Sequence, residues 1–299
     1  MNVTLSMRVV RREPMPCSFG INGAFRPAEK RDRTLIVFVH GFRGLPVSTW
    51  DDFLDFVDEF ECLRHADLLF YGYDSRRHRM QNIVIKFRDD MNAVWTDPFS
   101  LGPDAAAALS GRLAEVDIRE PPVWDHVHFV AHSLGAVVVR RAVIDCYLPG
   151  LDMHGDEHWS RRCTFSFFAP AHSGANVLKL IAATFRIGGL CLDLQYPCLE
   201  DLKEGCAALS DLREDYRGLP QDQRSVANAL AVILAEDDRV VNPGRFPGDP
   251  RPDQIAGKGH IDVCKPKQTF RDPVEKLARI VSNRLNLSKA RVGAQRGTE

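Results

Sequence analysis

A serine stands between a strand pattern and a helix pattern, and this junction limits the folds open to the chain. Residues 127–130 (VHFV) are apolar and β-branched, typical of a buried strand, and residues 136–139 (AVVV) open a helix. Between them lies Ser133, with the small residues Ala131 and Gly135 two positions away on each side. Such a corner lifts a hydroxyl out of a sheet as a nucleophile, and its sharpness requires small side chains at these two positions. Glycine is usual at the first of them, so Ala131 adds crowding without excluding the turn.

The composition fits one globular domain spanning residues 1–299. The chain of 299 residues is 44% hydrophobic and 26% charged, which is ordinary for a soluble domain with a substantial core. Its net charge of −1 argues against broad electrostatic binding to nucleic acid. We expect no transmembrane segment, because the sequence has no apolar run of about 18 residues. Residues 1–12 lack the apolar core of a signal peptide, so we expect a cytoplasmic protein. The oligomeric state has no signature in the sequence.

Cysteines and clustered histidines carry little chemistry here. The eight cysteines are scattered and include no C-x-x-C pair, so we expect free, mostly buried thiols in a reducing compartment. Asp152, His154, Asp156 and His158 have spacings that a metal site can use, but short runs of this kind need geometry to confirm them. We expect neither a metal nor an organic cofactor.

Strand patterns alternate with helix patterns along the chain. Strands are predicted at 34–39, 66–73, 127–130, 163–168 and 225–235, helices at 46–60, 78–95, 104–115 and 273–285, and an N-terminal hairpin from 7–11 and 17–25. This alternation predicts an α/β fold whose mainly parallel sheet has helices on both faces. We expect a helical lid or insertion at 176–217, a loop rich in proline and glycine at 243–259, and a flexible polar tail at 288–299.

Five chemically suggestive residues directly follow predicted strands: His40, Ser133, Pro170, Asp238 and His260. Parallel strands end at one edge of the sheet, and ligands bind at that edge. A serine hydroxyl needs a base to take its proton, and the base needs an orienting carboxylate. His260 suits the base. Asp237 and Asp238 are adjacent, and only one of them can face the imidazole, because neighbouring side chains point in different directions.

Five segments together resemble the α/β-hydrolases. They are 40–44 (HGFRG), 131–135 (AHSLG), 168–174 (FAPAHSG), 238–241 (DRVV) and 259–266 (GHIDVCKP). Within that superfamily the chain is similar to lipase-like serine esterases, near the GPI inositol-deacylase-like and serine active site-containing proteins, over about residues 33–285. Members often carry Thr-Pro-His-x-Gly where this chain has an extra residue before His172.

The resemblance implies an α/β-hydrolase fold and cleavage of a carboxylic ester, often a lipid ester, through an acyl-enzyme. Ser133 is then the nucleophile and His260 the base, and the D-x-V-V pattern favours Asp238 over Asp237 as the acid. The N–H groups of Phe42 and Leu134 are the expected oxyanion donors. Four further residues are expected to contact substrate: His40, Gly41, His132 and His172.

The expected partner is a small-molecule or lipid ester, with room for transient contact with a membrane surface. Leu178, Ile181, Phe185 and Ile187 form an apolar stripe in the expected lid, which would line an acyl pocket or simply pack on the core. The same triad would serve an acyltransferase or a thioesterase. A non-catalytic binding module with this fold is a further alternative, because fold does not establish function.

Overall fold

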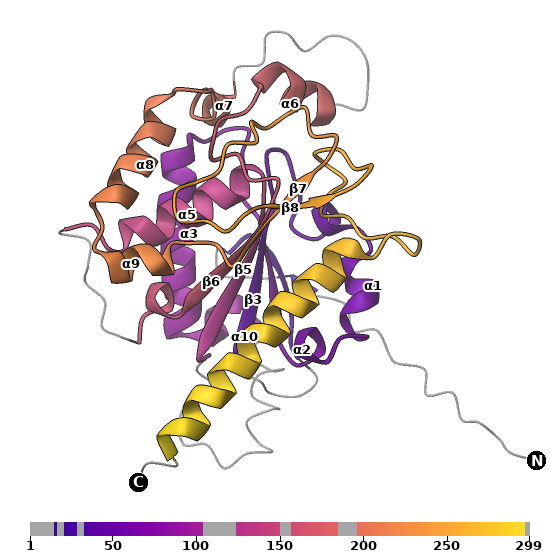
Figure 1. Cartoon of the computed structure of the whole chain (residues 1–299), viewed down its shortest axis with the longest axis vertical. Helices are drawn as coiled ribbons and strands as arrows, with labels where there is room; N and C mark the ends of the chain where they lie inside the picture. The colour runs from indigo at the N-terminus through magenta and orange to yellow at the C-terminus, as the bar shows by residue number, and fades with distance from the viewer. Residues whose placement is uncertain are drawn as a thin grey trace, which may run out of the picture.

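One mixed sheet organises the molecule. The computed structural model describes residues 15–16, 21–28, 33–103, 124–149, 157–184 and 196–296. Across these ranges a single eight-stranded sheet has the order β1-β2-β4-β3-β5-β6-β7-β8 (Figure 1). The strands are β1 (Met15–Pro16), β2 (Gly23–Arg26), β3 (Thr34–Val39), β4 (Asp67–Tyr71), β5 (His126–His132), β6 (Cys163–Phe168), β7 (Ala231–Ala235) and β8 (Asp253–Ile255). From β4 to β8 all neighbours are parallel, whereas β2 runs antiparallel to β4 and β1 antiparallel to β2. The predicted α/β-hydrolase class is confirmed.

Helices cover both faces of the sheet (Figure 1). One face carries α1 (Phe53–Val57), α2 (Glu61–Arg64) and α10 (Asp272–Arg296). The other carries α3 (Met80–Thr96), α5 (Leu134–Asp145) and α8 (Ala207–Gly218), with α5 between the other two. Short elements complete the set: α6 (Val177–Thr184), α7 (Pro197–Glu200), α9 (Gln221–Val226), and the 3-10 turns η1 (Ser48–Trp50), η2 (Pro98–Leu101) and η3 (Trp159–Arg161).

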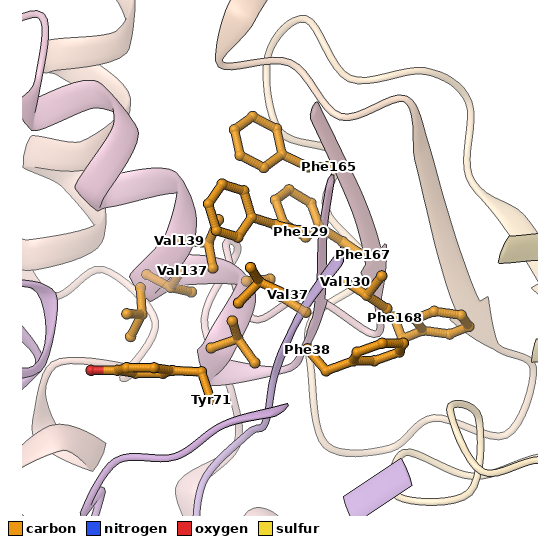
Figure 2. Close-up of a cluster of buried hydrophobic side chains, with 14 of the residues drawn as sticks. Val37, Phe38, Tyr71, Phe129, Val130, Val137, Val139, Phe165, Phe167 and Phe168 are labelled. Atoms are coloured by element: carbon orange, nitrogen blue, oxygen red, sulfur yellow. The ribbon is translucent and has the colours of Figure 1, made fainter. Parts of the chain in front are cut away.

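Aromatic and β-branched side chains of the central strands form the core (Figure 2). Every residue of β3 and β6 is buried, as expected for parallel strands covered on both sides. Phe38 stacks on Phe70 with 4.7 Å between ring centroids, and Phe129 lies 5.9 Å from Phe165. Val137 and Val139 of α5 pack onto the same cluster. This packing fixes the position of the end of β5, where Ser133 follows.

Several predicted boundaries differ from the structure, and the helix predicted at 46–60 is divided into η1 and α1. The strand predicted at 225–235 is helix α9 up to Val226 and strand only from Ala231. A break separates the two, because the Asn228 side chain accepts a hydrogen bond from the Tyr216 hydroxyl at 2.7 Å. The 243–259 loop contains the short strand β8, whose pairing with β7 is a tertiary effect. The last helix continues to Arg296 and so covers part of the expected tail 288–299, including Gly293.

Two predictions fall partly or wholly outside the described residues. They are the helix at 104–115 and the 7–11 half of the N-terminal hairpin. A hairpin-like pair is nevertheless present nearby, because β1 and β2 pair antiparallel through Met15 with Phe25 and Pro16 with Ala24.

Candidate active site

Ser133 occupies a strained turn between β5 and α5. Its backbone has φ 53° and ψ −118°, a conformation that costs about 1–3 kcal/mol for a residue with a side chain. The surrounding structure holds it there, since its N–H donates to the Phe168 carbonyl at 3.0 Å. A Cβ at Gly135 would lie 2.4 Å from the His40 carbonyl oxygen, so the turn requires glycine two residues after the serine. The sharp corner predicted from the sequence is present.

A hydrogen-bond chain joins Ser133, His260 and Asp238. The Ser133 hydroxyl donates to His260 Nε2 at 2.9 Å, and His260 Nδ1–H donates to Asp238 Oδ2 at 2.8 Å. The three residues follow β5, β7 and β8, and the parallel sheet brings those strand ends to one edge. The side chains of His260 and Asp238 are 2% and 7% exposed, so little water competes for this bond.

Backbone donors and the imidazole keep Asp238 ionised. Burial alone would raise the pKa of its carboxyl, but the hydrogen bond and charge of His260 outweigh burial and lower that pKa. The other carboxylate oxygen, Oδ1, accepts from the N–H groups of Val240 at 2.8 Å and Val241 at 3.2 Å. The D-x-V-V pattern therefore has a geometric basis. Asp237, the open alternative, has an exposed side chain, and the structure brings Asp238 to His260 instead.

A cavity of about 380 Å³ opens beside Ser133. Leu45, Leu180 and Ile261 give it apolar walls, whereas Thr49 and several charged side chains line its polar part. Gly41 and His132, two of the expected substrate-binding residues, are in this lining. A Cβ at Gly41 would lie 2.9 Å from the Ser133 Cβ, so glycine keeps the approach to the hydroxyl open.

The two expected oxyanion donors lie on the elements that flank the serine. Leu134 is the first residue of α5, where an N–H has no partner within its own helix. Phe42 lines the cavity on the loop after β3. The next two N–H groups of that loop are engaged, Arg43 N–H with Ser75 Oγ at 2.8 Å and Gly44 N–H with the Gly41 carbonyl at 3.1 Å. These bonds fix the loop so that Phe42 borders the cavity.

The sequence profile of the Alpha/beta hydrolase family matches residues 36–267, which include all three residues of the hydrogen-bond chain. The chain belongs to the alpha/beta hydrolase family. Among solved structures it is similar to the lipase BlEst2 of Bacillus licheniformis in its mature form, at 15% identity over 85% of this chain and 96% of that one, with a TM-score of 0.52. It is also similar to esterase B of Lactobacillus rhamnosis inhibited by a tributyrin phosphonate, at 13% identity over 91% and 83% of the two chains, with a TM-score of 0.53. At these identities the likeness shows a shared fold. No curated protein matches the sequence.

In this alpha/beta hydrolase His40 is buried and is not among the described residues that line the cavity. Its Nδ1–H donates to the Gly41 carbonyl at 2.8 Å, and its Nε2 accepts from the Tyr73 N–H at 3.2 Å. The ring stacks on Tyr73 with centroids 4.3 Å apart, and burial lowers the His40 pKa to about 4. A neutral His40 therefore shapes the loop that carries Phe42.

His172, also expected at the substrate, is buried on the far side of α5. Its Nδ1 accepts from Arg140 at 3.4 Å and its Nε2–H donates to the Ala136 carbonyl at 3.1 Å. Arg140 is fully buried and forms an ion pair with Asp249 at 2.5 Å. Burial, followed by the charge of Arg140, lowers the pKa of His172, so the ring stays neutral and can accept. The ring belongs to this internal cluster, which borders a void of only about 10 Å³.

The expected lid is helical where the structure describes it. Helices α6 and α7 lie within 176–217, and α8 ends one residue beyond it. Leu180 of α6 lines the cavity, and Leu178 is 72% exposed. The Ile181 side chain and residues 185–195, including Phe185 and Ile187, lie outside the described part. The ring of Phe42 contacts the ring of Tyr196, which precedes α7, in an edge-to-face arrangement with the centroids 5.1 Å apart. This segment therefore borders the cavity on one side.

Of the four residues considered for metal binding, His158 is the one that the structure describes. His158 makes hydrogen bonds of 2.8 Å to Ser160 Oγ and Asn92 Oδ1, while Asp152, His154 and Asp156 lie outside the described ranges. In the described part of the chain, no helix is long and apolar enough to cross a bilayer.

Proposed function

We propose that this alpha/beta hydrolase cleaves carboxylic esters through an acyl-enzyme formed on Ser133. The observation that carries the proposal is the unbroken hydrogen-bond chain from the serine hydroxyl through His260 to Asp238. A serine hydroxyl becomes an effective nucleophile when a positioned base accepts its proton. The strained turn at Ser133 is consistent with this role, because such strain clusters at active sites.

In the proposed mechanism Ser133 Oγ attacks the ester carbonyl carbon while His260 Nε2 takes the hydroxyl proton. The carboxylate of Asp238 orients the imidazole and stabilises its positive charge. The N–H groups of Phe42 and Leu134 hold the oxyanion, where each such donor contributes about 2.7–4 kcal/mol to transition-state binding. Collapse breaks the bond to the alcohol oxygen, which receives the proton from His260. Water, activated by the same imidazole, then releases the acid and restores Ser133.

The cavity suits an ester with a short or medium acyl group. Its apolar walls at Leu45, Leu180 and Ile261 can hold an acyl chain, and a volume of about 380 Å³ is at the small end of ligand sites. The narrower resemblance to GPI inositol-deacylase-like proteins favours a lipid ester, and the exposed Leu178 and Leu45 are placed for contact with a lipid surface. The residues at 176–217 would then act as a lid.

The expected cytoplasmic location is part of this proposal. Six cysteines in the described part are free: Cys62, Cys146, Cys163, Cys198, Cys206 and Cys264. Free thiols, most of them buried, suit a reducing compartment.

The test uses 4-nitrophenyl butyrate and a fluorophosphonate probe on wild type and Ser133→Ala. We expect the wild type to hydrolyse the ester and take up one probe per chain, and Ser133→Ala to lose both. Ser210→Ala is the matched control, since that serine is exposed on α8 and bonds only the Cys206 carbonyl. Equal labelling of wild type and Ser133→Ala would overturn the assignment. Adding ethanol tests the acyltransferase alternative, because the absence of any ethyl ester would exclude acyl transfer to this alcohol.

A further inference from the structure

Three cationic side chains line the cavity beside Ser133. Among its described lining residues Arg43, Lys265 and Lys267 are positively charged, and Asp51 is the one carboxylate. Lys265 lies on the loop that also carries His260, held by a turn in which its N–H donates to the Asp262 carbonyl at 3.1 Å. Arg43 follows Phe42, so the cations flank the reacting centre from two separate loops.

The two lysines differ in how their charge is compensated. Lys267 forms an ion pair with Asp51 and lies 4.0 Å from Asp52, so its charge is matched within the protein. Lys265 is half-buried, and the described residues include no ion-pair partner for its ammonium. Its charge reaches His132, the residue before Ser133: burial and the charge of His260 lower the pKa of His132 to about 3, and Lys265 adds to that shift.

A half-buried lysine that lines a ligand cavity favours an anion there. Water solvates it only in part, and a carboxylate or phosphate would restore the lost interaction at short range. The strand-edge cleft also concentrates its field. Two carboxylates of this site already have partners, since Asp238 is bound to His260 and Asp51 is paired with Lys267.

We propose that the site selects esters that carry an anionic group, a carboxylate or a phosphate, within reach of Lys265, and that Lys265 is the residue that determines this specificity. The proposal rests on the function proposed above, because it concerns the substrate of the same serine. The anion can belong to a soluble ester or to a lipid headgroup, and the chemistry that Lys265 recognises is the same.

The soluble arm compares matched esters. 4-Nitrophenyl hexanoate and mono-(4-nitrophenyl) adipate differ only in a terminal methyl against a carboxylate on the acyl side. Butyrate esters of 4-hydroxybenzamide and 4-hydroxybenzoate compare a neutral amide with a carboxylate on the alcohol side. The lipid arm compares release of fatty acid from phosphatidylcholine and phosphatidylglycerol vesicles. We expect the anionic member of at least one comparison to have a kcat/KM about tenfold higher in wild type, mainly through KM, and the advantage to shrink at high salt.

Substitutions at Lys265 then assign the preference. Lys265→Gln should bring the ratio of anionic to neutral kcat/KM close to one, Lys265→Glu should invert it, and Lys265→Arg should retain it. Lys86→Gln is the control, because Lys86 is an exposed lysine on α3 outside the cavity, paired with Asp90. Fluorophosphonate labelling reports that each variant is folded and reactive.

The outcomes separate the two proposals. Ser133-dependent hydrolysis with no anionic preference in either arm, or with a preference that survives Lys265→Glu, overturns the specificity and leaves the esterase intact. Loss of all Ser133-dependent hydrolysis and labelling is instead a failure of the esterase proposal. A Lys265-dependent preference confined to one arm supports the inference and identifies the source of the anion.

Discussion

The side chain of His132 holds the main chain of His260. His132 Nε2–H donates to the His260 carbonyl oxygen at 2.9 Å, and the two ring centroids lie 5.0 Å apart. His132 and Ser133 are consecutive, and both bind His260. His132 binds the His260 carbonyl oxygen, and Ser133 binds the His260 imidazole. Burial keeps His132 neutral, since it lowers the pKa to about 3. His132 is therefore a positioning residue for the base.

His132→Phe should lower kcat by about 10–100-fold, because a small displacement of a catalytic group has effects of this size. KM for 4-nitrophenyl butyrate should change much less. His132→Gln keeps an N–H donor and should recover part of the loss, which a purely steric role would not predict. Steady-state kinetics on the three proteins checks this, and full activity in His132→Phe would exclude the role.

Asp238→Asn should reduce kcat by about 10³–10⁴-fold. The amide can present a donor to His260 Nδ1 and so favour the wrong tautomer. Val240 and Val241 can still donate to its oxygen, so the fold should survive. Asp237→Asn is the matched control, with an exposed carboxylate one residue earlier, and should keep near-wild-type rates. The reverse ranking of the two variants would make Asp237 the acid.

Gly135→Ala should destabilise the protein by about 1–3 kcal/mol, the usual effect of overpacking. The new Cβ would meet the carbonyl oxygens of His40 at 2.4 Å and Val39 at 2.5 Å, both backbone atoms that cannot move aside cheaply. Gly218→Ala offers a contrast, since a Cβ there has nothing within 4 Å. Urea unfolding should show a lower midpoint only for the first variant.

Acid should destabilise the fold through its buried histidines, and His128 shows the sign. Burial, followed by the charges of His126 and Arg284, lowers the pKa of His128 to about 3. The two ring nitrogens of His128 form hydrogen bonds with Thr164 Oγ1 at 2.8 Å and Ser166 Oγ at 2.9 Å. The unfolded chain binds this proton first, near pH 6.5, so the contribution is complete above about pH 6.5 and is lost as pH falls toward about 3.

His128→Gln should therefore flatten the dependence of unfolding free energy on pH by about 1 kcal/mol per pH unit between pH 6 and pH 4. His78→Gln is the control, because water solvates that exposed ring in both states. Urea titrations at a series of pH values measure the slope. An unchanged slope in His128→Gln would contradict the assignment.

The sequence predicted those site residues whose position is determined by their immediate neighbours in the chain. The small residues around Ser133 and the residues after Asp238 each determine a local turn, so their roles are readable from the sequence. The directions of His40 and His172 depend on Tyr73 and Arg140, which are distant in sequence, so the sequence could not show that both rings are buried. Lys265 was overlooked as a cavity residue for the same reason, since only the folded loop turns it toward Ser133.

The buried pair of Arg140 and Asp249 links the helix that begins at the serine to the segment that follows β7. Asp249 also accepts from the Ala229 N–H at 2.9 Å, and the Arg140 guanidinium lies 4.0 Å from the centre of the Phe246 ring. Removing either partner would strand a charge inside the protein, which typically costs about 3–5 kcal/mol. A saturation scan for hydrolytic activity should therefore find two regions that tolerate few substitutions, the sheet edge at Ser133 and the cluster around Arg140 and Asp249. In the second region, substitutions should reduce activity because they impair folding, since these residues do not need to contact an ester.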